Sequence, residues 1–248
     1  MKTCITLSAL AITLLGCGGG GGGGGGGGSV NEQSANANAT EGIWSGSTKD
    51  SAGHMTDVLF VALENGELWG IQVTAATSSG GVMHGNIQPN NGSFSSTMRM
   101  YFSDKDTITT WTTSGNYTSK ATLNFTGDTP LQTTYNNAYA TRASLSDLAG
   151  TYSSNVISKN NAALDVDVSI DSRGKISGGD ASSCFVIGQA APRASGKNVF
   201  DVTLNAQGND CPSGTSSTSG IGILLGNEFT VFTENAANNN IIGFSGNK

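Results

Sequence analysis

A set of matching residues recurs along this sequence at one constant spacing, and this pattern restricts the possible folds more than any other feature. The segment Gly42–Ser45 matches Gly150–Ser153, and Gly66 matches Gly174; in both cases the second member follows the first by 108 positions. A unit of about 100 residues is too long for a solenoid repeat but large enough to be a domain. We therefore predict a duplicated unit that forms two tandem domains.

Short apolar segments separated by turn residues fill both units. Apolar residues alternate with polar ones along Leu164–Ile170, which is typical of a half-buried strand, and Asn65-Gly66 is a strong hairpin signal. No window shows a helical period, and Ser144–Leu148 is at most one helical turn. The expected strands are 56–63, 68–74, 82–88, 94–102, 107–113, 117–125 and 131–135, then 164–170, 176–178, 184–188, 198–206, 220–225, 229–233 and 241–244.

These strands predict an all-β fold in which two similar antiparallel halves follow one another. Strands this short need closure or a second sheet to protect their edges. The favoured architecture is a β-barrel of the calycin type in each half, with a β-sandwich as the runner-up and a single shared sheet as a further alternative. The predicted β domains are residues 42–140 and 141–248.

The N-terminus carries the features of a lipoprotein signal peptide. Residues 1–16 contain the basic Lys2 and a short apolar run, and Leu14-Leu15-Gly16-Cys17 matches the lipobox of bacterial lipoproteins. The apolar run is too short to span a membrane as a helix. We expect cleavage before Cys17 and acylation of this residue, so that two or three acyl chains hold the protein in a membrane. An ordinary signal peptide that happens to contain a cysteine is the alternative.

Residues 17–41 predict a flexible tether. Gly18 to Gly28 is an unbroken glycine run, and the segment that follows is polar and shows no periodicity. Glycine, not the aspartate associated with retention in the inner membrane of enteric bacteria, follows Cys17. This favours the outer membrane of a Gram-negative bacterium and leaves open whether the protein faces the cell surface or the periplasm.

Several segments resemble a group of uncharacterised proteobacterial lipoproteins with a glycine-rich tether. These segments are Ala143–Tyr152, Ile176-Ser177-Gly178 before Cys184, and Lys197–Leu204 before Cys211. The tether and the β-barrel halves are also loosely similar to surface lipoproteins of the transferrin-binding and factor H-binding type. Neither resemblance implies an activity, a cofactor or a binding residue.

The charge of the chain limits its partners. Charged residues make up 12% of the sequence and the formal net charge is −6. A chain with few Lys and Arg residues cannot neutralise many phosphates, so we expect no nucleic-acid partner. Its expected partners are the lipid bilayer, through the acylated Cys17, and a protein, a glycan or a small apolar ligand.

Two cysteines remain once Cys4 is removed with the signal peptide and Cys17 is acylated. Cys184 and Cys211 are expected to form a disulfide, because the bacterial envelope is oxidising. Free thiols or a metal pair are the alternatives, but the spacing of these cysteines is not that of a metal motif, and neither lies near a histidine.

No set of residues predicts catalysis, a cofactor site or a metal site. His54 is expected in an exposed loop, and His84 in the middle of a strand as a partly buried, hydrogen-bonded side chain. Asp165, Asp167 and Asp171 are expected on the solvent face of a strand, because they alternate with apolar residues. They do not form an EF-hand loop, since the Gly and Glu positions of that loop are absent. Paired carboxylates for glycoside hydrolysis remain open, since their separation depends on the fold.

Trp69 and Trp111 have two interpretations: core residues, which is the commoner outcome, or residues that line a pocket or a barrel mouth.

The expected function is that of a non-enzymatic binding module, anchored in the outer membrane. An envelope enzyme or enzyme inhibitor, with a site built from polar loop residues, is the alternative. If the barrel is open and lined by aromatic residues, the binding of a ligand is favoured. If the barrel is filled, contact with another protein through loops is favoured.

Overall fold

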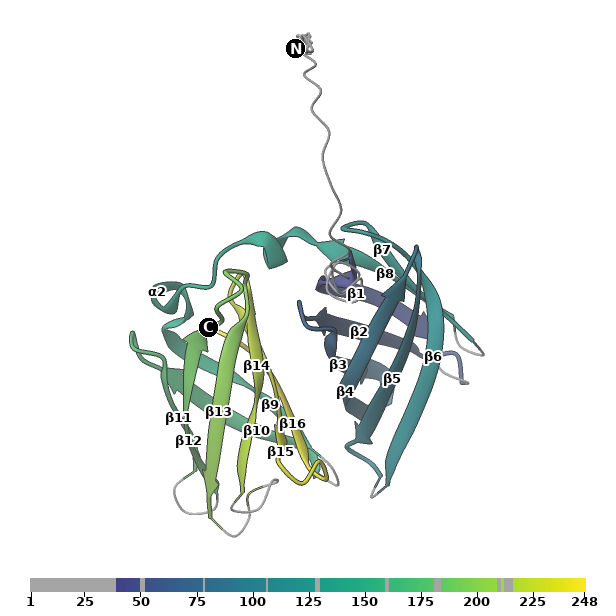
Figure 1. Cartoon of the computed structure of the whole chain (residues 1–248). Helices are drawn as coiled ribbons and strands as arrows, with labels where there is room; N and C mark the ends of the chain where they lie inside the picture. Colours follow the sequence, from purple (N-terminus) through teal and green to yellow (C-terminus); the bar gives the residue numbers. More distant parts are fainter. Residues whose placement is uncertain are drawn as a thin grey trace, which may run out of the picture. The chain divides into compact units, whose positions relative to one another are not determined.

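The computed structural model describes residues 39–248, except residues 50–51, 78, 106, 128–129, 159–160, 181–183, 209–210 and 212–215. In this part of the chain, strands β1–β8 form one closed barrel and strands β9–β16 form a second (Figure 1). The all-β fold with two barrel halves is therefore confirmed. The sandwich and the single shared sheet are wrong.

The first barrel is drawn from purple to teal in Figure 1. Its strands are β1 (Gly42–Lys49), β2 (Met55–Ala62), β3 (Glu67–Thr74), β4 (Ser79–Asn90), β5 (Ser93–Phe102), β6 (Ile108–Thr118), β7 (Thr122–Thr126) and β8 (Leu131–Asn136). A short 3-10 helix, η1 (Ala75–Thr77), connects β3 to β4, and a second, η2 (Asn137–Ala140), follows β8.

The second barrel begins after a single helical turn, α2 (Leu145–Leu148), which the side chain of Ser144 caps. Its strands are β9 (Gly150–Ser158), β10 (Asn161–Ile170), β11 (Lys175–Asp180), β12 (Cys184–Pro192), β13 (Phe200–Gln207), β14 (Ser217–Leu225), β15 (Glu228–Asn235) and β16 (Ile241–Asn247). None of the helices in the described part of the chain is long and apolar enough to cross a membrane.

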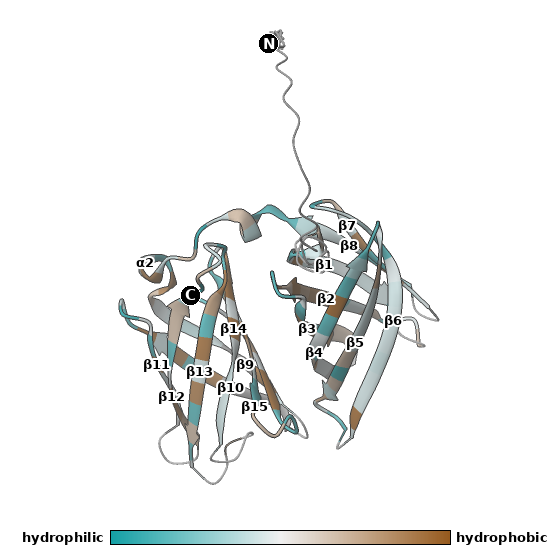
Figure 2. Ribbon diagram, in the orientation of Figure 1, coloured by the Kyte–Doolittle hydropathy of each residue, from teal (hydrophilic) through white to brown (hydrophobic). Residues whose placement is uncertain are grey.

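Each barrel has the simplest possible connectivity. Every strand pairs antiparallel with the next, β8 pairs back with β1, and β16 pairs back with β9. Closure removes the exposed strand edges that short antiparallel sheets otherwise present. Buried and exposed residues alternate strictly along β13, and hydrophobic and hydrophilic segments alternate along this strand in Figure 2.

Matching positions of the two barrels make matching turns. Gly66 and Gly174 have φ angles of 82° and 79°, a left-handed conformation that favours glycine. The nitrogen of Gly66 donates to the oxygen of Leu63 at 3.0 Å, and the nitrogen of Gly174 donates to the oxygen of Asp171 at 2.9 Å. Both hairpins therefore use a tight turn that ends in a left-handed glycine.

The aromatic residue near the start of each barrel also makes an equivalent bond. Trp44 Nε1 donates to the carbonyl oxygen of Thr40 at 2.9 Å, and the Tyr152 hydroxyl donates to that of Leu148 at 2.6 Å. In both cases the aromatic side chain holds the backbone four residues earlier, where the chain enters the barrel. These equivalences agree with the spacing of 108 positions, although duplication of an ancestral unit remains a prediction.

Each barrel has its own apolar core. The first core includes Trp44, Phe60, Phe94 and Phe125, and the second includes Tyr152, Phe200, Phe229 and Phe244. A third cluster contains residues of both barrels, and its members on strands point outward from their sheets. It consists of Ile43, Val61, Leu63, Trp69, Ile71, Val82, Tyr101, Tyr139, Val199, Ile221, Ile223, Phe232 and Ile241.

The third cluster explains why the apolar run in β2 is nearly continuous. Val58 and Phe60 face the first core, whereas Val61 and Leu63 face the second barrel, so this strand is buried on both faces. The barrels also approach closely at Gly243, where an added Cβ atom would lie 2.6 Å from Cγ2 of Val82. The two barrels therefore share a packed apolar interface.

One predicted strand, 117–125, is wrong. β6 continues to Thr118, the chain turns at Lys120, and β7 begins at Thr122. Lys120 has a φ angle of 54°, which is uncommon for a residue other than glycine, and the nitrogen of Ala121 donates to the oxygen of Thr118. Because the turn lacks glycine and proline, the sequence gives no clear signal for it.

Candidate functional site

The first barrel contains a cavity of about 600 Å³ at one end. This volume is within the range of small-molecule binding sites. The cavity lies at the end of the barrel where β1 and β7 finish and β2 and β8 begin. It is lined by Thr48, Lys49, Thr56, Val58, Phe60, Gln72, Met83, Met100, Trp111, Thr112, Thr113, Thr126, Gly127 and Leu131.

Aromatic and thioether side chains form the apolar wall of this cavity. Phe60 and Met83 are buried, and Trp111 and Met100 are partly exposed. The ring of Trp111 stacks on Phe125 with centroids 5.7 Å apart, which holds it against the inner wall. Trp111 therefore lines a barrel cavity, the less common of its two interpretations, whereas Trp69 is 2% exposed and belongs to the core between the barrels.

Threonine hydroxyl groups form much of the polar wall. Thr113 Oγ1 donates to the backbone oxygen of Thr126 at 3.0 Å, and Thr48 Oγ1 donates to that of Pro130 at 3.3 Å. The hydroxyl groups of Thr56 and Thr74 lie 2.7 Å apart. These bonds fix the threonine rotamers, so the polar wall is already formed without a ligand.

The second barrel is almost filled. Its cavity is about 60 Å³ and is lined by apolar side chains and backbone, among them Val156, Val186 and Phe244. The disulfide between Cys184 and Cys211, which confirms the prediction, packs here with Ala206. This cavity lies at the end of the second barrel that corresponds to the open end of the first barrel.

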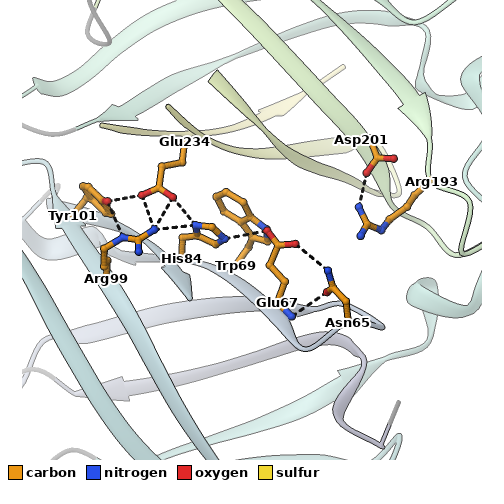
Figure 3. A network of polar contacts seen from close by, with 9 residues as sticks. All are labelled: Asn65, Glu67, Trp69, His84, Arg99, Tyr101, Arg193, Asp201 and Glu234. Carbon is orange, nitrogen blue, oxygen red and sulfur yellow. Dashed lines mark hydrogen bonds and ion pairs between the residues drawn. The ribbon is translucent and has the colours of Figure 1, made fainter. Parts of the chain in front are cut away.

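A polar network lies outside both barrel interiors and joins the two barrels (Figure 3). His84 on β4 lies between two carboxylates: its Nδ1 is 2.6 Å from Oε2 of Glu234 on β15, and its Nε2 is 3.0 Å from Oε1 of Glu67 on β3. The imidazole also stacks on Trp69 with centroids 3.6 Å apart. This confirms the predicted partly buried, hydrogen-bonded His84.

Glu234 has further partners from the first barrel. Arg99 Nη2 donates to both of its oxygens, at 3.0 and 2.8 Å, and the Tyr101 hydroxyl donates to Oε1 at 2.5 Å. The Glu234 side chain is only 4% exposed, so these bonds replace the water that a buried carboxylate loses. A further ion pair between the barrels joins Arg193 to Glu64, with Nε and Oε1 2.8 Å apart.

These contacts keep the network charged. Hydrogen bonding to His84 lowers the pKa of Glu67. Burial works against the imidazolium of His84, but its bonds to Glu234 and Glu67 outweigh burial and raise its pKa. Burial likewise disfavours the ionised Glu234, but its bonds to His84, Tyr101 and Arg99 lower its pKa; burial and the bond to Glu234 raise the pKa of Tyr101 to about 12.

This arrangement suits a structural clasp rather than an acid–base site. Both ring nitrogens of His84 are occupied by carboxylates, so neither is available to a substrate. The imidazole also fills the space between Glu67 and Glu234 that a glycosidic bond would need. The network therefore fixes one barrel to the other.

The remaining candidate residues have structural positions. His54 precedes β2 in a loop, as expected, but is only partly exposed. Asp167 is exposed on β10 and accepts a bond from Ser153. Asp171 is not on the strand but in the β10–β11 turn, where it accepts bonds from the nitrogens of Arg173 and Lys175, and these bonds lower its pKa.

The signal peptide, Cys17 with its expected acylation and the tether up to residue 38 lie outside the described residues, and so does the side chain of Asp165. At the end of the predicted tether, Thr40 is buried and its carbonyl oxygen accepts the bond from Trp44. Within the part of the chain that is described, no three His, Cys, Asp or Glu side chains are grouped as a metal site would require.

Sequence reasoning missed Glu234, the most buried acidic residue of the network. The available signal was its phase in β15: Glu234 is two residues after Phe232, so both side chains leave the same face of the strand. Comparisons of the chain with protein-family models, with curated proteins and with solved structures found no match.

Proposed function

We propose that this protein is a non-enzymatic binding protein of the bacterial envelope, and that it holds a small, largely apolar molecule in the first barrel. The cavity of about 600 Å³ carries this proposal. Trp111, Phe60 and the two methionines supply apolar surface, and the fixed threonines supply a few polar groups, which together are typical of small-molecule sites.

The N-terminal sequence supports the proposed location. The lipobox at Cys17 and the glycine run after it are suited to an outer-membrane lipoprotein whose folded part stands clear of the lipid. Replacing Cys17 with Ser should abolish incorporation of labelled palmitate and release the protein from outer-membrane fractions. Retention of the label would contradict acylation at this residue.

The binding proposal is tested with phenylnaphthylamine, a neutral dye that becomes fluorescent in apolar surroundings. We use residues 17–248 with Cys17→Ser, prepared under oxidising conditions, so that no acyl chain, detergent or apolar signal peptide competes for the dye and Cys4 is absent. We expect saturable binding and energy transfer from the tryptophans, since Trp44, Trp69 and Trp111 all lie on strands of the first barrel. Absence of saturable binding would overturn the proposal.

A matched pair of variants assigns the dye to one barrel. Val58 and Val166 are equivalent by the spacing of 108 positions, and each lines the cavity of its own barrel. Val58→Phe should weaken dye binding by about tenfold, because the added ring occupies the site. Val166→Phe should leave binding within about twofold. The reverse result would move the site to the second barrel.

A further inference from the structure

The chemical character of the cavity wall indicates which ligands it accepts, if the first barrel is the binding site as proposed above. Among the described residues that line the cavity, Lys49 is the one with an ionisable side chain, and it is exposed at the end of β1. A charged group placed deeper would lose its hydration without meeting a counter-charge. The interior is therefore suited to an uncharged molecule.

The hydrogen bonds of the threonines determine what the polar wall offers. A hydroxyl group donates one hydrogen and accepts through two lone pairs. Thr113 and Thr48 use their hydrogens on the backbone oxygens of Thr126 and Pro130, so that only their acceptor capacity is left. Inside the mouth, the described lining side chains that can also donate are Gln72, through its amide, and Trp111, through its indole N–H. At Thr113 and Thr48 the wall therefore offers acceptors.

The apolar wall favours a ring over a plain chain. Phe60 and Trp111 present aromatic surfaces, and rings pack well on rings in offset or edge-to-face geometry. Met83 and Met100 add polarizable thioether groups, which adapt their shape to a ligand and contact ring edges favourably.

We propose that the first barrel selects a neutral, ring-bearing molecule with a hydrogen-bond donor, such as an aromatic or alicyclic alcohol. The donor group bonds to the hydroxyl oxygen of Thr113 or Thr48, and the ring lies against Trp111 and the methionines. Carboxylates and other anionic amphiphiles are excluded from the depth of the cavity.

Four probes with one naphthyl body and different head groups test this selection. They are naphthylmethanol, its methyl ether, naphthoate and naphthylmethylammonium, each used to displace phenylnaphthylamine from residues 17–248 with Cys17→Ser. We expect the alcohol to bind about three- to tenfold more tightly than the methyl ether, which cannot donate, and both charged probes to bind more weakly still.

The outcomes separate the ligand class from the function. If no probe displaces the dye and the dye itself does not bind, the proposed function fails. If the probes bind but the ether equals the alcohol, or naphthoate binds best, the proposed function survives and the ligand class is wrong. If naphthoate binds and Lys49→Met abolishes this binding, the anion is bound by Lys49 at the rim of the cavity.

A pair of threonine variants locates the preference. Thr113→Val keeps the side-chain shape and removes the hydroxyl, so the advantage of the alcohol over the ether should fall to about twofold or less. Thr97→Val, on the outer face of β5, serves as the control and should keep the full advantage. An unchanged advantage in Thr113→Val and in Thr48→Val would overturn the proposal. Circular dichroism verifies that each variant is folded.

Discussion

The two barrels share their strand order and their turn geometry, but their interiors differ. The cavity of the first barrel, which is open at one end, has a volume of about 600 Å³, and that of the second barrel about 60 Å³. Thr48 in the first barrel and Val156 in the second occupy equivalent positions and line the two cavities, so a hydroxyl in one corresponds to a methyl in the other. The backbone thus determines the barrel, and a few side chains at one end determine whether it is hollow.

The difference is concentrated at the end where the disulfide lies. In the second barrel Cys184, Ala206 and Cys211 pack together there, whereas the first barrel has the threonine-lined opening. Four predictions test this comparison and the interface that joins the barrels, in order of decreasing effect.

The largest effect is expected from Glu234→Ala, which removes the carboxylate that bonds the second barrel to the first. The change leaves His84, Arg99 and Tyr101 without their shared acceptor, and loss of one partner from a buried charged group costs about 3–5 kcal/mol. Urea denaturation measures this loss. Glu228→Ala, at the start of the same strand, is the control and should change the free energy of unfolding by less than about 1 kcal/mol. Similar small losses in both variants would contradict the clasp.

The second prediction concerns the disulfide of the filled barrel. Cys184→Ser combined with Cys211→Ser opens a loop with a sequence separation of 27 residues and should lower stability by about 3 kcal/mol. The melting temperature should fall by roughly 6–12 °C. Dye binding in the first barrel should persist below the new melting temperature. A stability equal to that of the parent chain would show that the disulfide contributes nothing.

The third prediction uses the same substitution in a hollow and in a filled interior. Val166→Phe should cost about 1–3 kcal/mol, because the second barrel has little room for added atoms. Val58→Phe should cost less than about 1 kcal/mol, since its ring can enter the cavity. Thermal denaturation of both variants provides the comparison, and equal costs would mean that the interiors differ less than their volumes indicate.

The smallest effect is expected from pH. The folded state raises the pKa of His84, so it binds a proton more tightly than the unfolded chain does. The resulting stability is fully present below the ordinary histidine pKa of about 6.5 and is lost as the pH rises through the raised value. Carboxylates Glu67 and Glu234, with Arg99 and Tyr101, face this ring. His84→Gln should remove this decline in denaturation measurements between neutral and mildly alkaline pH; a decline that persists would assign it to another group.

Much of the fold follows from local patterns. Alternation in β13 and the left-handed glycines Gly66 and Gly174 predict strands and turns without reference to distant residues. The turn at Lys120 was not predicted because its conformation is imposed by the two strands that it joins, not by its residue types.

The cavity and the interface between the barrels could not be predicted in the same way. A threonine in a strand can line a cavity, belong to a core or face the solvent, and which of these applies depends on strands that are far away in sequence. Val61 and Phe232 point outward from their own barrels and are nevertheless fully buried, because the other barrel covers them. Burial of Glu234 has the same origin.

The shared interface has a consequence for solubility. Val61, Leu63 and Phe232 are fully buried in the intact chain, and each would meet water if its barrel were produced alone. Exposed apolar patches of this kind promote self-association. Cutting the chain between η2 and α2 should therefore yield two fragments that aggregate separately and recover solubility when they are refolded together.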